Sequence, residues 1–169
     1  MHQKITLILT VTCSVSAFAD QILVDANGFG DYTNIQDAID VANDGDEVIV
    51  LPGTYTARDV ADTEVVNMLG KEISLLSFAG AATCIIDAEL ARRGIVCANG
   101  ETNATLIDGF TIRNGSALLG GGAGIRISAA STTIEDCELE EFVPQALLAV
   151  VVVAVLGACN QLTACCPPL

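Results

Sequence analysis

The sequence predicts an all-β protein in which parallel strands form a coil, or solenoid, behind one short N-terminal helix. From residue 70 onward, apolar pieces of four to six residues are separated by Gly, Asn and Ala. Three pieces, "CIIDAEL", "TLIDGFTI" and "TTIEDCEL", superimpose at Ile86, Ile107 and Ile134, and an acid follows each isoleucine. The offsets of 21 and 27 residues between these isoleucines are typical of a coil in which each turn repeats a strand.

The N-terminal elements follow from local patterns. Residues 21–26, "QILVDA", are predicted to form a strand that ends in turn residues. Thr33 and Gln36 form a predicted capping box, in which each side chain accepts a hydrogen bond from the other residue's backbone N–H. A helix to about Asn43 should follow, and its buried stripe is set by apolar residues at helical spacing: Ile35, Ala38, Ile39 and Ala42.

The remaining strands are short and rich in β-branched residues. Residues 47–55, "EVIVLPGTY", read as one strand closed by a Pro-Gly turn. Residues 71–77 fit an early strand of the coil, and residues 124–128 fit a strand on another side. Alternation should place Ile125 and Ile127 inside and Arg126 outside. Each turn of such a coil needs a neighbour to bury its faces, so the ends need caps.

Three stretches resemble a known group of proteins. "VDANGFGDYTNIQDAIDVANDGDEVIVLPGTYT" resembles the N-terminal capping segment of secreted right-handed parallel β-helix proteins of the pectin-lyase-like superfamily, and "GKEISLLS" with "TLIDGFTIRNG" resembles their first coils. The resemblance covers about residues 21–139. It implies a right-handed parallel β-helix of about three coils, whose short helix closes the open end of the stack and which is incomplete at the C-terminus.

Residues 1–19 have the layout of a secretory signal peptide: Lys4, an apolar run too short to span a bilayer, and a small-residue ending. The protein is therefore expected to be secreted or at the cell surface. Cleavage would remove His2, the only histidine, and change the net charge from −14 to −15. Such an acidic surface repels nucleic acid. The six cysteines that remain have irregular spacing and indicate neither a zinc site nor a knotted scaffold.

Residues 142–169 contain no charged residue and differ in composition from residues 20–141, the predicted cap and coils. One interpretation is a weak membrane anchor, which would be the chain's only contact with a membrane. The other is a shifted reading frame, because a GC-rich run encoding valines and alanines can read as consecutive glycines one base earlier. Genomic DNA distinguishes them: a frame that meets a stop at once, or encodes no glycine run, would exclude the shift.

The candidate ligand-binding residues are Asp87, Asp108 and Glu135, which follow the equivalent isoleucines and should stack on successive coils about 4.8 Å apart. Stacked carboxylates repel unless a cation or a proton intervenes, which makes calcium a candidate ligand. The simpler interpretation is that they are solvent-facing strand residues. Arg113 could oppose an acidic sugar or pair with a nearby carboxylate. The loop from Asp25 fails the EF-hand pattern, and no catalytic residue, resident metal or cofactor is assigned.

Two functions follow as expectations. The first is a secreted β-helix repeat module with a structural, adhesive or carbohydrate-binding role, whose partner would be an acidic or neutral polysaccharide or a cell-surface component. The second, implied by the resemblance, is a truncated polysaccharide lyase or pectinesterase-like enzyme. A shared fold does not transfer activity, and the constellations that such enzymes need usually lie on later coils.

Overall fold

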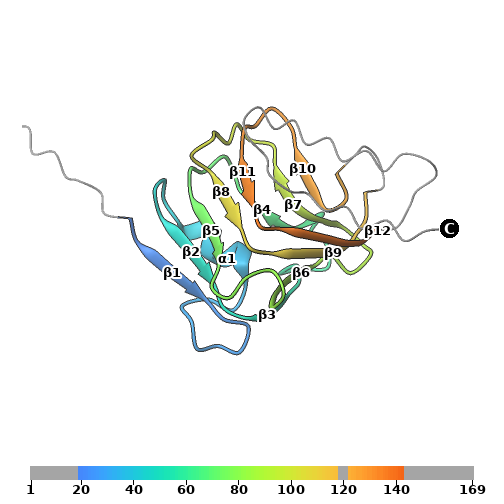
Figure 1. Ribbon diagram of the computed structural model, residues 1–169, viewed down its shortest axis with the longest axis horizontal. Coiled ribbons are helices and arrows are strands. Elements are labelled where there is room, and N and C mark those ends of the chain that lie inside the picture. The colour runs from blue at the N-terminus through green and yellow to red at the C-terminus, as the bar shows by residue number, and fades with distance from the viewer. Residues whose placement is uncertain (1–18, 118–121, 143–169) are drawn as a thin grey trace, which may run out of the picture.

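In the described part of the chain, parallel strands in three sheets coil around one apolar interior, with a single short helix near the N-terminus (Figure 1). The structure, a computed structural model, describes residues 19–117 and 122–142 of the 169-residue chain. The predicted fold class, an all-β parallel solenoid with an N-terminal helix, is confirmed. Nearly all of the predicted signal peptide, nearly all of the apolar tail, and residues 118–121 lie outside the described residues.

From β2 onward, each complete coil contributes one strand to each sheet, so neighbouring strands in a sheet are three strands apart in the chain, whereas the first turn contributes only β1. Sheet A contains β1 (Gln21–Val24), β2 (Glu47–Val50), β5 (Ser74–Ser77), β8 (Leu106–Asp108) and β11 (Thr133–Glu135). Sheet B contains β3 (Gly53–Tyr55), β6 (Cys84–Asp87), β9 (Thr111–Gly115) and β12 (Glu138–Phe142). Sheet C contains β4 (Glu64–Asn67), β7 (Arg93–Cys97) and β10 (Ile125–Ile127).

The register of sheet A measures the length of one turn. Gln21 pairs with Glu47, Glu47 with Ser74, Ser74 with Leu106, and Leu106 with Thr133, so successive turns take 26, 27, 32 and 27 residues. The five strands of this sheet make about four turns, one more than the sequence predicts. The additional turn arises because β1 and β2, predicted as parts of the cap, pair in parallel and belong to the same stack as the later coils.

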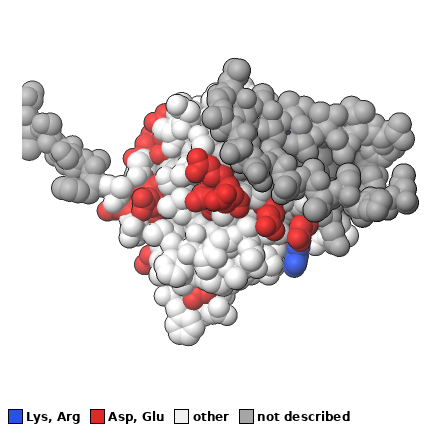
Figure 2. Space-filling view, in the orientation of Figure 1, with Lys and Arg blue, Asp and Glu red and all other residues white. Residues whose placement is uncertain are grey.

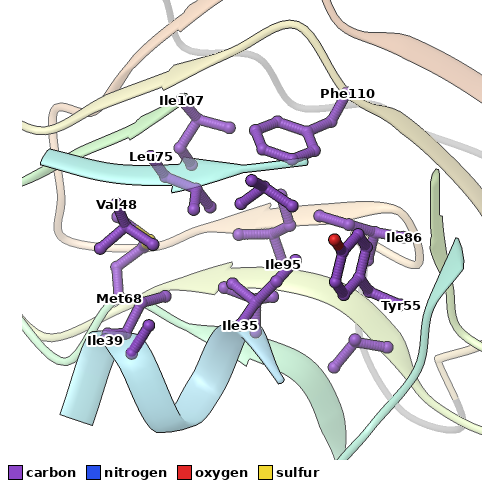
Figure 3. Close-up of a cluster of buried hydrophobic side chains, with 14 of the residues drawn as sticks. Ile35, Ile39, Val48, Tyr55, Met68, Leu75, Ile86, Ile95, Ile107 and Phe110 are labelled. Carbon is purple, nitrogen blue, oxygen red and sulfur yellow. The ribbon is translucent and has the colours of Figure 1, made fainter. Parts of the chain in front are cut away.

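The interior is built from columns of apolar side chains, one residue from each strand. In sheet A, Val48, Leu75 and Ile107 are consecutive partners and are 0% exposed. In sheet B, Ile86 and Ile112 form an equivalent column above Tyr55. Side chains from all three sheets meet in this interior (Figure 3). Burial of each such side chain contributes about 1.5–3 kcal/mol relative to exposure, which stabilises the coil.

The helix α1 (Ile35–Val41) covers the N-terminal end of the stack. It contacts β1, β2 and β4, the strands of the first turns. Figure 3 shows Ile35 and Ile39 pointing from the helix into the apolar interior. The predicted apolar stripe is confirmed, since all four of its residues are buried: Ile35, Ala38, Ile39 and Ala42.

The capping box predicted for α1 is wrong in its first residue. The N-cap is Asn34, whose side-chain oxygen accepts a hydrogen bond from the Gln36 backbone N–H at 2.8 Å. Gln36 does not return a bond to Thr33. Its amide instead pairs with the backbone of Asn67, accepting from N–H at 2.7 Å and donating to the carbonyl at 3.2 Å. The contact with β4 therefore occupies the Gln36 side chain, which the predicted capping box would have used for a bond to Thr33.

The C-terminal end of α1 is closed by a residue that the local sequence does not indicate. The Lys71 ammonium donates to the carbonyl oxygens of Asp40 and Ala42, at 2.9 and 2.8 Å, and also to that of Ile39. Unpaired carbonyls and the negative end of the helix dipole both favour a cation here. Lys71 comes from the next coil, so this cap joins the helix to the solenoid.

Residues 47–55 form two strands and not the one that was predicted. β2 ends at Val50, and β3 begins at Gly53 in a different sheet. Leu51 and Pro52 lie between them, at the corner where the chain passes from sheet A to sheet B. The Pro-Gly pair thus turns a coil corner, and it does not end the strand pattern.

Candidate functional site

The predicted column of three stacked acids exists only in part. Asp108 and Glu135 are direct partners in sheet A. Asp87 lies in sheet B, where its partner is Arg113. The predicted stacking of Asp87 on Asp108 is therefore wrong, and the four candidate residues fall on two faces of the solenoid.

The error arises because strands of different sheets have the same local pattern. Both β6 and β8 place an isoleucine inside and an acid directly after it, so their sequences superimpose. In the structure, the sheet A partner of Ile107 on the preceding coil is Leu75, and not Ile86. The residue that lies beside Asp108 on that coil is accordingly Leu76.

On sheet A, a continuous column of outward-facing side chains runs across all the coils. Alternation along the strands places it beside the buried column of Val48, Leu75 and Ile107. Its members are apolar on the first three strands and acidic on the last two: Leu23, Ile49, Leu76, Asp108 and Glu135. The face therefore offers an apolar stripe that ends in two carboxylates. We call it the sheet A column.

The carboxylates of the sheet A column repel one another. Burial raises the pKa of Asp108 above its ordinary value, and the negative charges of Asp136 and Glu135 raise it further. No lysine or arginine occupies a register position in this column. A cation, a proton or a ligand that donates hydrogen bonds would therefore be stabilised beside Asp108. Asp136 is the member of this group that the sequence analysis did not single out.

The sheet B pair has the opposite electrostatics. Arg113 Nε donates to Asp87 Oδ2 at 2.9 Å, and Asn114 Nδ2 donates to Asp87 Oδ1 at 2.9 Å. Burial alone would raise the pKa of Asp87. The hydrogen bonds from Asn114 and the Glu89 backbone N–H, together with the Arg113 guanidinium, outweigh burial and lower this pKa. Arg113 is thus the ion-pair partner of Asp87, which is one of its two predicted roles.

Glu101 is a buried carboxylate that was not predicted from the sequence, and its hydrogen bonds stabilise the fold. Glu101 is 2% exposed, and its oxygens accept from the backbone N–H groups of Gly70 and Asn99, both at 2.9 Å. These bonds offset the penalty for burying a charge. They fasten the loop of one coil to that of the coil below it, and they leave Glu101 inaccessible to a ligand.

In the loop that begins at Asp25, the carboxylate of this residue accepts a hydrogen bond from the loop's own backbone. Asp25 is 5% exposed, and its Oδ1 accepts from the Asn27 backbone N–H at 2.9 Å. A side chain at Gly30 would lie 2.6 Å from the carbonyl oxygen of Leu23, so only glycine permits this close approach. Within residues 19–117 and 122–142, no group of three or more His, Cys, Asp or Glu residues is placed to hold a metal ion.

Two depressions flank the loop that precedes β4. One is lined by residues of α1 and β4 together with Arg58, whose guanidinium donates to Asp37 and Asp40 at 3.0 and 2.8 Å. The other is lined in part by Arg92, which is 7% exposed and donates to the carbonyl oxygens of Asp59 and Asp62. Asp108 and Glu135 line neither depression.

Acidic side chains occur in several places on the face shown in Figure 2, with far less basic surface.

Three cysteines of the described region, Cys84, Cys97 and Cys137, carry free thiols. Burial raises the pKa of Cys97 and of Cys137 to about 11, so both thiols are poor nucleophiles. No helix in the described part of the chain is long and apolar enough to cross a membrane.

The fold is that of a parallel β-solenoid of about four turns with a helix at its N-terminal end. Comparison with known proteins adds nothing to this description: no protein-family model, no curated protein and no solved structure matches the chain.

Proposed function

We propose that the chain is a secreted or cell-surface β-helix repeat module of the pectin-lyase-like superfamily, with an adhesive role that depends on carbohydrate binding. The sheet A column is the observation that carries this proposal. Its apolar part suits the C–H faces of sugar rings, and its two carboxylates can accept hydrogen bonds from sugar hydroxyls. The parallel solenoid and its helical cap agree with the fold that the sequence resemblance implies.

The column also supports the proposed class of ligand. Strands in a parallel sheet are spaced about 4.8 Å apart, so the column presents regularly spaced contacts along the solenoid axis. An extended polymer such as a polysaccharide can follow that direction. With a neutral polymer the hydroxyls would donate to Asp108 and Glu135. With an acidic polymer, calcium would have to bridge the two sets of carboxylates.

Binding to one acidic and one neutral polysaccharide tests the proposal. The full chain is titrated with polygalacturonate and with a neutral galactan, each with calcium and with a chelator. The double variant Asp108→Asn/Glu135→Gln should bind about tenfold more weakly, a change of about 1.4 kcal/mol. The control Glu138→Gln/Glu140→Gln also removes two negative charges, but from sheet B of the last coil, and should bind normally. Equal losses in both variants, or no binding to either polymer, would contradict the proposal.

An enzyme is the second candidate, and the Asp108 and Glu135 pair is again the relevant observation. Two adjacent carboxylates, one with a raised pKa, are what acid-base hydrolysis of a glycosidic bond needs. Turnover of polygalacturonate and of methyl-esterified pectin, with and without calcium, decides between the candidates. Robust turnover that Asp108→Asn abolishes would favour the enzyme, whereas binding without turnover favours the adhesive module.

A further inference from the structure

The two ends of the solenoid differ in how they are covered. At the N-terminal end, α1 lies against the first strands and buries its apolar stripe there. At the other end, β10, β11 and β12 are each the last strand of their sheet, so each is paired on one side within the described region. We call the surface formed by these three strands the last-coil end. Its strand edges carry backbone donors and acceptors that a further strand could pair with.

Among the described residues, the apolar positions of the last-coil end are less buried than those of the coil beneath it. Four interior residues of this coil have direct partners on the coil beneath them. The partners are 0% exposed, but the four residues themselves are only partly buried, in the pairs Ile134 on Ile107, Leu139 on Ile112, Ile125 on Ile95 and Ile127 on Cys97. The same apolar position is therefore closed in one coil and open in the next.

We infer that the occupant of the last-coil end is this chain's own segment 143–169, laid over it as a further coil. The segment follows β12 directly and contains 27 residues, which is the length of a turn in this solenoid. Its valine-rich part has high β-propensity.

The spacing of the earlier coils also predicts which sheet the valines of segment 143–169 would join. From sheet B to sheet C the chain advances ten residues between Ile85 and Ile95, and fourteen between Thr111 and Ile125. The same advance from Glu138, the partner of Thr111, reaches residues 148–152. The valine run would thus lie over Ile125 and Ile127 of β10 and complete sheet C.

Charge favours this occupant over a second copy of the chain. The last coil carries exposed acids at Glu135, Asp136, Glu138 and Glu140, and two such ends brought together would repel. Segment 143–169 contains no charged residue and adds no repulsion. It can therefore approach strand edges that an acidic partner would avoid.

Hydrogen exchange on the full chain tests the inference. Amides of β10 should exchange at least about tenfold faster in Val151→Asp/Val153→Asp, because a charge cannot be buried against Ile125 and Ile127. Amides of β2 should be unaffected. The control Val60→Asp makes the same change at a residue that is 92% exposed and should leave β10 protected.

Two further measurements keep the test decisive. If the aspartate substitutions also accelerate amide exchange in β2, the milder Val151→Thr/Val153→Thr variant should still accelerate exchange in β10 selectively. Sedimentation of the full chain should show a monomer at all concentrations. Unchanged exchange in β10 in both valine variants would overturn the inference, as would a dimer whose dissociation alone exposes β10.

Discussion

Asp87 and Asp108 each follow a buried isoleucine, yet the charged residue on the neighbouring strand is positive for one and negative for the other. Asp87 faces Arg113 across sheet B, and its pKa is lowered. Asp108 faces Glu135 across sheet A, and its pKa is raised. The two acids should therefore respond oppositely when their charge is removed.

The substitution Asp87→Asn is expected to destabilise the protein by about 1–3 kcal/mol at pH 7, because the amide leaves donors of Arg113 or Asn114 unpaired in a site that is mostly buried. The lowered pKa means that this stability is present above the ordinary Asp value of 3.8 and is lost as pH falls through the folded-state pKa. Urea unfolding at pH 7 and at about pH 3 checks both statements. A variant as stable as the parent at pH 7 would contradict the first.

The substitution Asp108→Asn is expected to stabilise the protein at pH 7 by about 0.2–1 kcal/mol, since it relieves the repulsion between like charges opposite each other on neighbouring strands. The raised pKa means that this penalty is fully present above the folded-state pKa of Asp108 and disappears below the unfolded one. Thermal unfolding at pH 7 should show a higher midpoint for the variant than for the parent. A lower midpoint would indicate that Asp108 has a stabilising partner.

At the level of single elements, α1 shows how tertiary contacts replace a local motif. The sequence predicts its apolar stripe correctly, because helical spacing alone determines which residues share a face. It predicts the wrong capping residue, because Gln36 has a better partner in the backbone of Asn67, which is remote in the sequence. Lys71 was not predicted as a cap for the same reason.

The N-cap assignment can be tested with two neighbouring residues. Asn34→Ala should lower the free energy of unfolding by about 1 kcal/mol, the usual effect of removing an N-cap side chain. Thr33→Ala is the matched control and should change it by a few tenths of a kcal/mol, as at other exposed sites. Urea denaturation of both variants checks the assignment. A larger loss for Thr33→Ala would restore the capping box that the sequence favours.

For the whole molecule, the dominant property is the net charge of −14. Like charges on the surface of a compact protein repel and lower its stability. The described ion pairs offset a few of these charges, among them Arg58 with Asp37 and Asp40, and Arg113 with Asp87. Most of the repulsion is left for solvent ions to screen.

The thermal midpoint at pH 7 should therefore rise with added sodium chloride. Going from about 10 mM to about 150 mM salt shortens the Debye length from about 30 to about 8 Å, so repulsion between distant carboxylates is largely removed. The increase should be smaller at about pH 4, where many carboxyl groups are protonated. A midpoint that is independent of salt at pH 7 would show that local ion pairs already balance the charge.

The solenoid, the buried isoleucines of the strands in which an acid follows isoleucine, and the apolar face of the helix could be predicted from the sequence alone. These features depend on periodicity, which is local and can be read along one strand or one helix. The extra first turn and the corner at Leu51 and Pro52 were missed, because a bend between sheets leaves no periodic signal of its own.

Which strands share a sheet, and therefore which charges meet, depends on the tertiary structure. Strands such as β6 and β8 have the same pattern of isoleucine and acid, so their sequences cannot say that one belongs to sheet B and the other to sheet A. The register depends on the lengths of the corners and loops in every coil. That register pairs Asp87 with Arg113 and leaves Asp108 opposite Glu135.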